Sequence, residues 1–189
     1  MYKHLFVPVD GSELSHRAMD GSIELAKQLG ARITGFVVEP DLPISTLSRD
    51  GSEFMDRVKS HEKKNETHAA ALLGQFEKRA ATAGVPFTAQ QVTAYGVGQS
   101  IVEEAERSGC DMIVMVTEGR SRVGKFVFGS HTKDVIIDSK LPVLVLRLLR
   151  VRGVAALDIA SVKAYNPQSG ACYRAHHPLY RPGGTRSAQ

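Results

Sequence analysis

Two short segments, far apart in the chain, carry residue types suited to binding a phosphorylated nucleoside. The first reads VPVDGS over residues 7–12, where Asp10 and Gly11 form a turn between an apolar run and the start of a helix. A carboxylate at such a turn can accept hydrogen bonds from ribose hydroxyls or help to hold a magnesium ion. The alternative is a turn residue that only accepts hydrogen bonds from its own backbone.

The second segment is the loop TEGRSRVGKFVFGS, residues 117–130. Gly119, Gly124 and Gly129 let the backbone approach a ligand closely, and Ser130 opens a helix whose free N–H groups favour an anion. Positive charge in the same loop comes from Arg120, Arg122 and Lys125. These features predict a phosphate site, with a solvated glycine-rich loop as the alternative.

Both segments follow predicted strands in a chain that alternates strand and helix. We expect strands at about 3–9, 32–38, 87–93, 112–116 and 143–146, and helices at about 12–30, 53–83, 99–107 and from 130. This alternation is typical of a parallel sheet covered by helices on both faces, where ligands bind beyond the carboxyl ends of the strands. Pro8 cannot donate to a sheet ladder, so we expect it near the carboxyl end of the first strand's pairing.

The chain resembles the universal stress protein family over about residues 3–147. The segment DMIVMVTEGRSRVGKFVFGSHTKDVIIDSKLPVLVL, residues 111–146, is similar to the family's C-terminal signature, and VPVDGSELSHRAM is similar to its opening. The resemblance implies one universal stress protein domain over residues 1–148. Its expected fold is α/β and adenine nucleotide alpha hydrolase-like, a doubly wound five-stranded parallel sheet with strand order 3-2-1-4-5.

The phosphate loop of nucleotide-binding members reads glycine, two residues, glycine, nine residues, glycine, then serine or threonine. This chain supplies the last three of these as Gly119, Gly129 and Ser130, whereas Val116 stands in the place of the first glycine. A β-branched residue restricts the backbone and fills space. A strain of roughly 1–3 kcal/mol would weaken nucleotide binding by about one to two orders of magnitude.

The resemblance also implies which residues bind the nucleotide. On the adenine and ribose side these are Pro8, Asp10 and Val38. Around the ribose and phosphates they are Met115, Val116, Gly119, Gly129, Ser130 and His131. The implied ligand is ATP or a related adenine nucleotide, with Mg²⁺ as a possible companion ion.

We therefore expect a stress-response regulator that binds an adenine nucleotide. One alternative is a nucleotide-independent dimeric interaction module, in which Val116 marks the loss of the site; another is a slow ATPase that uses His131 or bound water. A conventional P-loop ATPase is not expected, because the chain has no GxxxxGK[ST] motif. His61 and His68 stand seven residues apart without a suitably spaced carboxylate, so we expect no metal site there.

The formal charge of +4 is unevenly distributed. Six basic residues against Asp158 alone give residues 148–189 a charge of +5 and leave the first 147 residues at −1. We expect residues 149–189 to be a basic, poorly ordered extension, with a transient helix near 151–162. Its dispersed cations lack aromatic platforms, so nucleic acid is an unlikely partner.

The remaining features concern location and assembly. The longest apolar stretch near the end, residues 141–149, is too short to cross a bilayer, and no signal peptide is apparent, so we expect a cytoplasmic protein. Cys110 and Cys172 suggest neither a disulfide framework nor a zinc site. The last strand, residues 142–148, is expected at the sheet edge, and the resemblance implies a homodimer through this strand.

Overall fold

The computed structural model describes residues 2–41, 51–117, 130–151, 154–166 and 171–175. Five parallel strands form most of one sheet: β1 (His4–Pro8), β2 (Arg32–Glu39), β3 (Phe87–Thr93), β4 (Met112–Thr117) and β5 (Val143–Val151). They lie side by side in the order β3-β2-β1-β4-β5. The predicted five parallel strands and their order are thereby confirmed.

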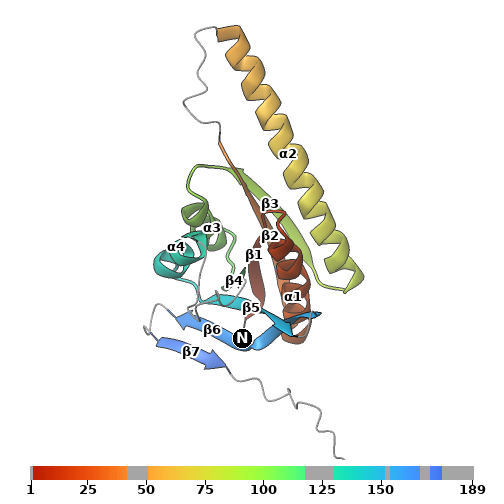
Figure 1. Ribbon diagram of the computed structural model, residues 1–189, viewed down its shortest axis with the longest axis vertical. Helices are drawn as coiled ribbons and strands as arrows, with labels where there is room; N and C mark the ends of the chain where they lie inside the picture. Colours follow the sequence, from red (N-terminus) through yellow and green to blue (C-terminus); the bar gives the residue numbers. More distant parts are fainter. Residues whose placement is uncertain (1, 42–50, 118–129, 152–153, 167–170, 176–189) are drawn as a thin grey trace, which may run out of the picture.

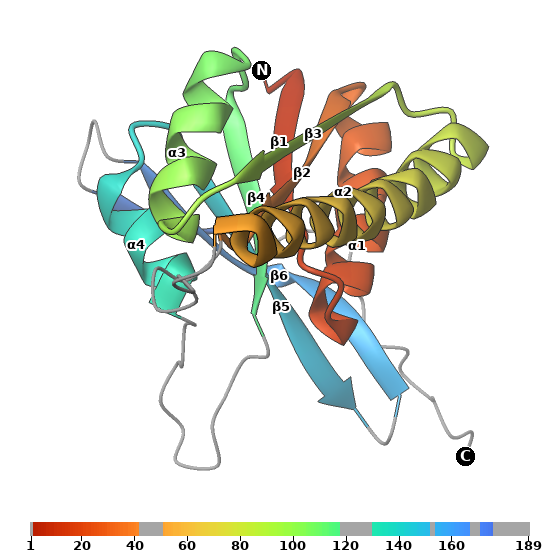
Figure 2. The same ribbon diagram turned by 90° about the horizontal axis from the view of Figure 1, so that it is seen from above.

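Four helices cover the two faces of this sheet. They are α1 (Glu13–Leu29), α2 (Gly51–Thr82), α3 (Val97–Arg107) and α4 (Ser130–Asp138). Helices α1 and α2 lie on one face and α3 and α4 on the other, as Figures 1 and 2 show. Two separate apolar clusters follow from this arrangement. One packs α1 and α2 on the sheet around Leu5, Phe76 and Val114, and the other packs α3 and α4 around Phe6, Phe36 and Ile113.

Helix α1 begins and ends where its capping residues predict. The Ser12 side chain accepts a hydrogen bond from the backbone N–H of Ser15, which satisfies one of the free donors of the first turn. At the other end Gly30 adopts a left-handed conformation with φ of 59°, and its N–H bonds to the carbonyls of Ala26 and Lys27. The first helix therefore leaves the sheet immediately after the Asp10–Gly11 turn.

Helix α2 is longer than the sheet it covers, and its first part extends beyond the carboxyl end of β2 (Figure 1). In the second half of the helix Leu72, Phe76 and Ala80 are buried against the sheet. Nearer its start Met55 is about half exposed, at 52%. No helix among the described residues is both long enough and apolar enough to cross a membrane.

The sheet continues past β5 with two further strands, which differ from the sequence-based expectation. β6 (Val154–Asn166) pairs antiparallel with β5, and β7 (Ala171–Ala175) pairs antiparallel with β6. These residues belong to the segment expected to be poorly ordered, and residues 154–162 form a strand rather than a transient helix. β5 is therefore not at the edge of the sheet. The backbone groups of β5 that face away from β4 find hydrogen-bonding partners in this C-terminal segment.

Candidate functional site

The carboxyl end of β1 separates from β4 at Pro8, because the backbone of proline lacks a hydrogen-bond donor. The N–H of Val9 donates to the carbonyl of Phe36 in β2, so by alternation along the strand the nitrogen of Pro8 faces β4. Proline has no N–H to donate there. The pairing of β1 with β4 accordingly covers Leu5 and Phe6 only, whereas β4 stays paired with β5 as far as Thr117. Pro8 is the last residue of β1, in agreement with its expected position near the carboxyl end of the pairing.

This separation lies where the strand order reverses, because the chain places β2 and β3 on one side of β1 and β4 and β5 on the other. In open α/β sheets, ligands bind beyond the carboxyl ends of the strands at this reversal. Asp10 comes two residues after Pro8 and is exposed at this position. The structure therefore places the predicted carboxylate at the position of the sheet that most favours a ligand.

Asp10 is held in place by the turn that follows it. Its Oδ1 atom accepts the N–H of Ser12 at 3.0 Å and the hydroxyl of Ser15, while the Asp10 N–H donates to Ser15 Oγ at 2.7 Å. Burial alone would raise the pKa of Asp10, but the hydrogen bonds from Ser12 and Ser15 outweigh it and the pKa is lowered. Within the described residues, Oδ2 accepts no hydrogen bond. An ionised oxygen is thus available to a hydroxyl donor or a cation.

Val38 and Met115 present side chains to the same face of the sheet. Both belong to the cluster under α3 and α4, where Met115 is 9% exposed and Val38 is partly buried. Val116 packs against the other cluster, under α1 and α2. Since neighbouring residues of a strand point to opposite faces, the Val116 side chain is directed away from the face on which Val38 and Met115 lie. The Val116 side chain, which was expected to crowd the nucleotide, therefore takes up space in the α1–α2 core instead.

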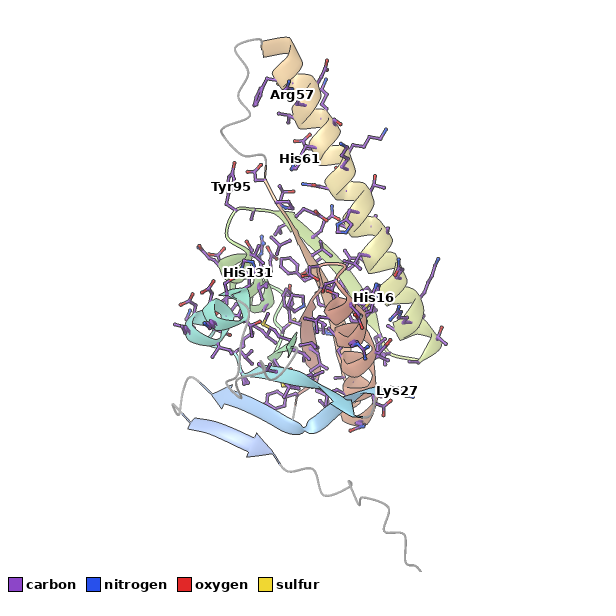
Figure 3. The ribbon with its side chains drawn as sticks, in the orientation of Figure 1. His16, Lys27, Arg57, His61, Tyr95 and His131 are labelled. Atoms are coloured by element: carbon purple, nitrogen blue, oxygen red, sulfur yellow. The ribbon has the colours of Figure 1, made fainter. Side chains whose placement is uncertain are left out.

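Ser130 and His131 lie at the same edge of the sheet as Asp10. Both are exposed in the first turn of α4, where Figure 3 labels His131. One turn later, the side chain of Asp134 lies so close to Gly98, in the first turn of α3, that a Cβ on Gly98 would be 2.8 Å from the Asp134 Cβ. Helix α3 follows the carboxyl end of β3, so the free N–H groups of α4 also lie at that end. Gly119 and Gly129 lie outside the described residues.

A set of polar contacts that no sequence pattern predicted ties α2 to this edge. His68 Nδ1 lies 2.6 Å from Oε1 of the buried Glu39, the last residue of β2. The Nε2 atom of His68 would be 3.2 Å from a Cβ on Gly11, whose φ of +80° already favours glycine. His61 and Asn65 both donate to the carbonyl of Pro40. The seven-residue spacing of His61 and His68 places both on one side of a helix, and from the sequence alone it was considered only as a metal motif.

An open depression on the molecule lies at the opposite, amino end of the sheet. It is lined by Lys3, His4, Lys27, Arg32 and Asp111 among others, and by none of the predicted site residues. Among the described residues, no group of three or more His, Cys, Asp or Glu side chains could hold a metal ion. The geometry at the carboxyl edge therefore rests on the turn after β1, the ends of β2 and β4, and the start of α4.

The profile of the universal stress protein family matches residues 1–147. The chain belongs to the universal stress protein family. A relative, universal stress protein YxiE of Bacillus subtilis, is 28% identical over 155 residues, which cover 78% of this chain and 100% of YxiE. MJ0531 of Methanocaldococcus jannaschii, also a universal stress protein, is 29% identical over 148 residues, 78% of this chain and 83% of that protein.

Solved structures show the same fold at lower identity. A universal stress protein in complex with cAMP aligns with a TM-score of 0.55 at 23% identity, covering 77% of this chain and 97% of that one. A family member from Arabidopsis thaliana with AMP bound aligns with a TM-score of 0.54 at 18% identity, covering 77% and 91%. The fold of this universal stress protein is therefore shared with chains that hold adenine nucleotides.

Proposed function

We propose that this universal stress protein binds an adenine nucleotide at the carboxyl edge of its sheet, beside the separation of β1 from β4. The observation that carries the proposal is the Asp10 carboxylate. It is ionised, oriented by Ser12 and Ser15, and keeps one oxygen without a partner among the described residues at the strand-order reversal. A ribose hydroxyl is the donor that such an oxygen suits.

The other described residues complete a nucleoside-sized environment. Pro8, Val38 and Met115 supply apolar surface on one face of the sheet, which suits the flat face of an adenine ring. The free N–H groups at the start of α4 suit a phosphate, because a helix N-terminus favours an anion. The proposal assigns Ser130 and His131 to this phosphate end, together with Gly119 and Gly129. The bound AMP and cAMP of the two family members named above support the ligand class.

The finer proposal is that the ligand is ATP, with Mg²⁺ as its counter-ion, and that the protein acts in the cytoplasm as a regulator of a stress response. Support for ATP over AMP comes from the length and charge of the 117–130 segment, which carries three cations and ends at a helix N-terminus. The homodimer implied by the family resemblance needs a free edge on β5, and β6 pairs with that edge.

Titration calorimetry with AMP, ATP and ATP with Mg²⁺ on the purified chain tests the proposal. Asp10→Asn keeps an oxygen that can accept from Ser12 and Ser15 but removes the charge. A hydrogen bond to a charged group contributes about 1.5–3 kcal/mol, so we expect affinity to fall by about ten- to hundredfold. Asp138→Asn, the same change on an exposed residue at the far end of α4, should leave affinity unchanged.

The same titrations separate this proposal from a nucleotide-independent module. Absence of heat with all three ligands, together with no thermal stabilisation at millimolar nucleotide, would remove nucleotide binding and leave the interaction module. Tighter binding of ATP than of AMP is expected if the 117–130 segment receives phosphates. Equal affinities would retain the nucleoside site and reject the assigned phosphate end.

A further inference from the structure

The β5 strand has a partner on each side, although it is the last parallel strand of the sheet. On one side it pairs with β4 over Val143–Arg147. On the other it pairs antiparallel with β6 in two stretches, 143–145 and 147–151, with an irregularity between Val145 and Arg147. β6 in turn pairs with β7. The chain therefore adds a hairpin of its own to the sheet, as Figure 1 shows below β5.

The first half of β5 is apolar, so it would favour association with another chain if its edge were exposed. Val143 and Val145 are buried in the α3–α4 cluster, and Leu144 and Leu146 are buried in the α1–α2 cluster. An apolar edge strand with free N–H and C=O groups pairs readily with a strand from another chain. A second copy of this same strand is the simplest such partner, since it would bring an identical apolar segment.

We infer that the β6–β7 hairpin caps the edge of β5 and so prevents a second copy of this chain from pairing there. Each backbone N–H and C=O on that side of β5 can serve one neighbouring strand, so pairing with β6 and pairing with another β5 exclude each other. The intrachain partner is favoured, because residues 152 and 153 alone separate β6 from β5 and closing so short a loop has a small entropic cost. Beyond β6, the described sheet ends in the five-residue β7.

Capping of β5 does not depend on nucleotide binding. Its first test is the mass of the full chain in solution, by light scattering after size exclusion over a wide concentration range without nucleotide. We expect the monomer mass of 20.5 kDa. A dimer whose two β5 strands can be linked to each other through engineered cysteines would overturn the inference.

Engineered cysteines identify which strand lies against β5. Arg147 and Asp158 are directly opposite in the β5–β6 register, at a separation that a disulfide can span. In a Cys172→Ser background, Arg147→Cys with Asp158→Cys should close within one chain under mild oxidation. Arg147→Cys with Lys163→Cys is the control, because Lys163 is opposite Val145 and lies five residues farther along β6. Efficient closure of the control alone, or disulfide-linked dimers of the single variant Arg147→Cys, would contradict the assignment.

A proline variant tests whether the cap is what prevents association. Leu157→Pro places a residue without an N–H inside β6, opposite Leu148. We expect concentration-dependent dimers in this variant and none in Ser187→Pro, where the same residue is introduced beyond β7 in the sequence. A folded Leu157→Pro variant that stays monomeric would show that β6 is not what prevents association. If that variant fails to fold, the disulfide pair decides.

Discussion

His4 is a buried histidine whose environment determines its protonation. The residue is 7% exposed, and its two ring nitrogens contact different partners. An Arg32 guanidinium nitrogen lies 3.0 Å from Nδ1, and Thr34 Oγ1 lies 2.7 Å from Nε2. Nδ1 also lies 3.3 Å from the carbonyl oxygen of Gly109, which can accept a proton from this nitrogen, whereas the Arg32 guanidinium can only donate to it. Burial, and then the positive charge of Arg32, lower the pKa of His4 below its ordinary value of 6.5.

The lowered pKa of His4 predicts a loss of stability in mild acid. The unfolded chain takes up a proton at this residue near pH 6.5, while the folded chain resists it until a lower pH. The stabilisation is therefore complete above about pH 6.5 and is lost as the pH falls from there through the lower pKa of the folded chain. Urea unfolding between about pH 7.5 and 5.5 should show a smaller pH slope in His4→Gln than in the wild type. Equal slopes would mean that His4 titrates normally in the folded chain.

At the scale of elements, β2 passes close under α2 at a glycine. Gly35 of β2 lies beneath Phe76 of α2 and Phe87 of β3, whose ring centroids are 4.9 Å apart. A Cβ on Gly35 would be 2.5 Å from Phe87 and 3.0 Å from Phe76. Here a glycine is needed for close approach, because two aromatic rings occupy the space that a side chain would take.

Gly35→Ala should therefore destabilise the protein, by about 1–3 kcal/mol, because both rings must shift in a packed core. Gly74→Ala is the matched control. Gly74 lies inside α2, and a Cβ at this position would have nothing within 4 Å, so alanine should stabilise the helix by up to about 1 kcal/mol. Denaturant unfolding of both variants gives the comparison. Similar changes in the two variants would mean that the rings yield without cost.

At the scale of the whole molecule, the proposed nucleotide would join segments that are far apart in the chain. The turn after β1, the end of β2, the end of β4 and the start of α4 all lie at the same edge of the sheet. A ligand that contacts all of them binds only the folded chain, since the unfolded chain does not bring them together. Binding must then raise the stability of the whole domain.

A thermal shift measures this coupling. At a nucleotide concentration one hundred times its dissociation constant the folded state gains about 2.7 kcal/mol, which for a domain of this size corresponds to about 5–10 °C. Asp10→Asn should lose most of the shift at the same concentration, whereas Asp138→Asn should keep it. A shift of equal size in wild type and Asp10→Asn would place the ligand elsewhere on the molecule.

Local sequence patterns were sufficient to predict the parallel strands and their helices. They also predicted that Pro8 lies near the carboxyl end of the first strand's pairing and that Asp10 lies in the turn that follows. These features depend on side-chain period, capping chemistry and the missing proton of proline, which act between residues close in the chain. The family motif extended the prediction to the strand order, confirmed here, and to the residues of the proposed site.

Other features depend on contacts between residues distant in sequence. No local pattern shows that Val116 packs on the α1–α2 face, that His68 pairs with Glu39, or that Gly35 lies under two rings. Residues 154–166 and 171–175 carry no clear period, yet they form strands, because the edge of β5 offers β6 backbone partners and β6 offers them to β7. A strand that forms because a neighbouring strand has unpaired N–H and C=O groups can be identified only from the tertiary structure that brings the two strands together.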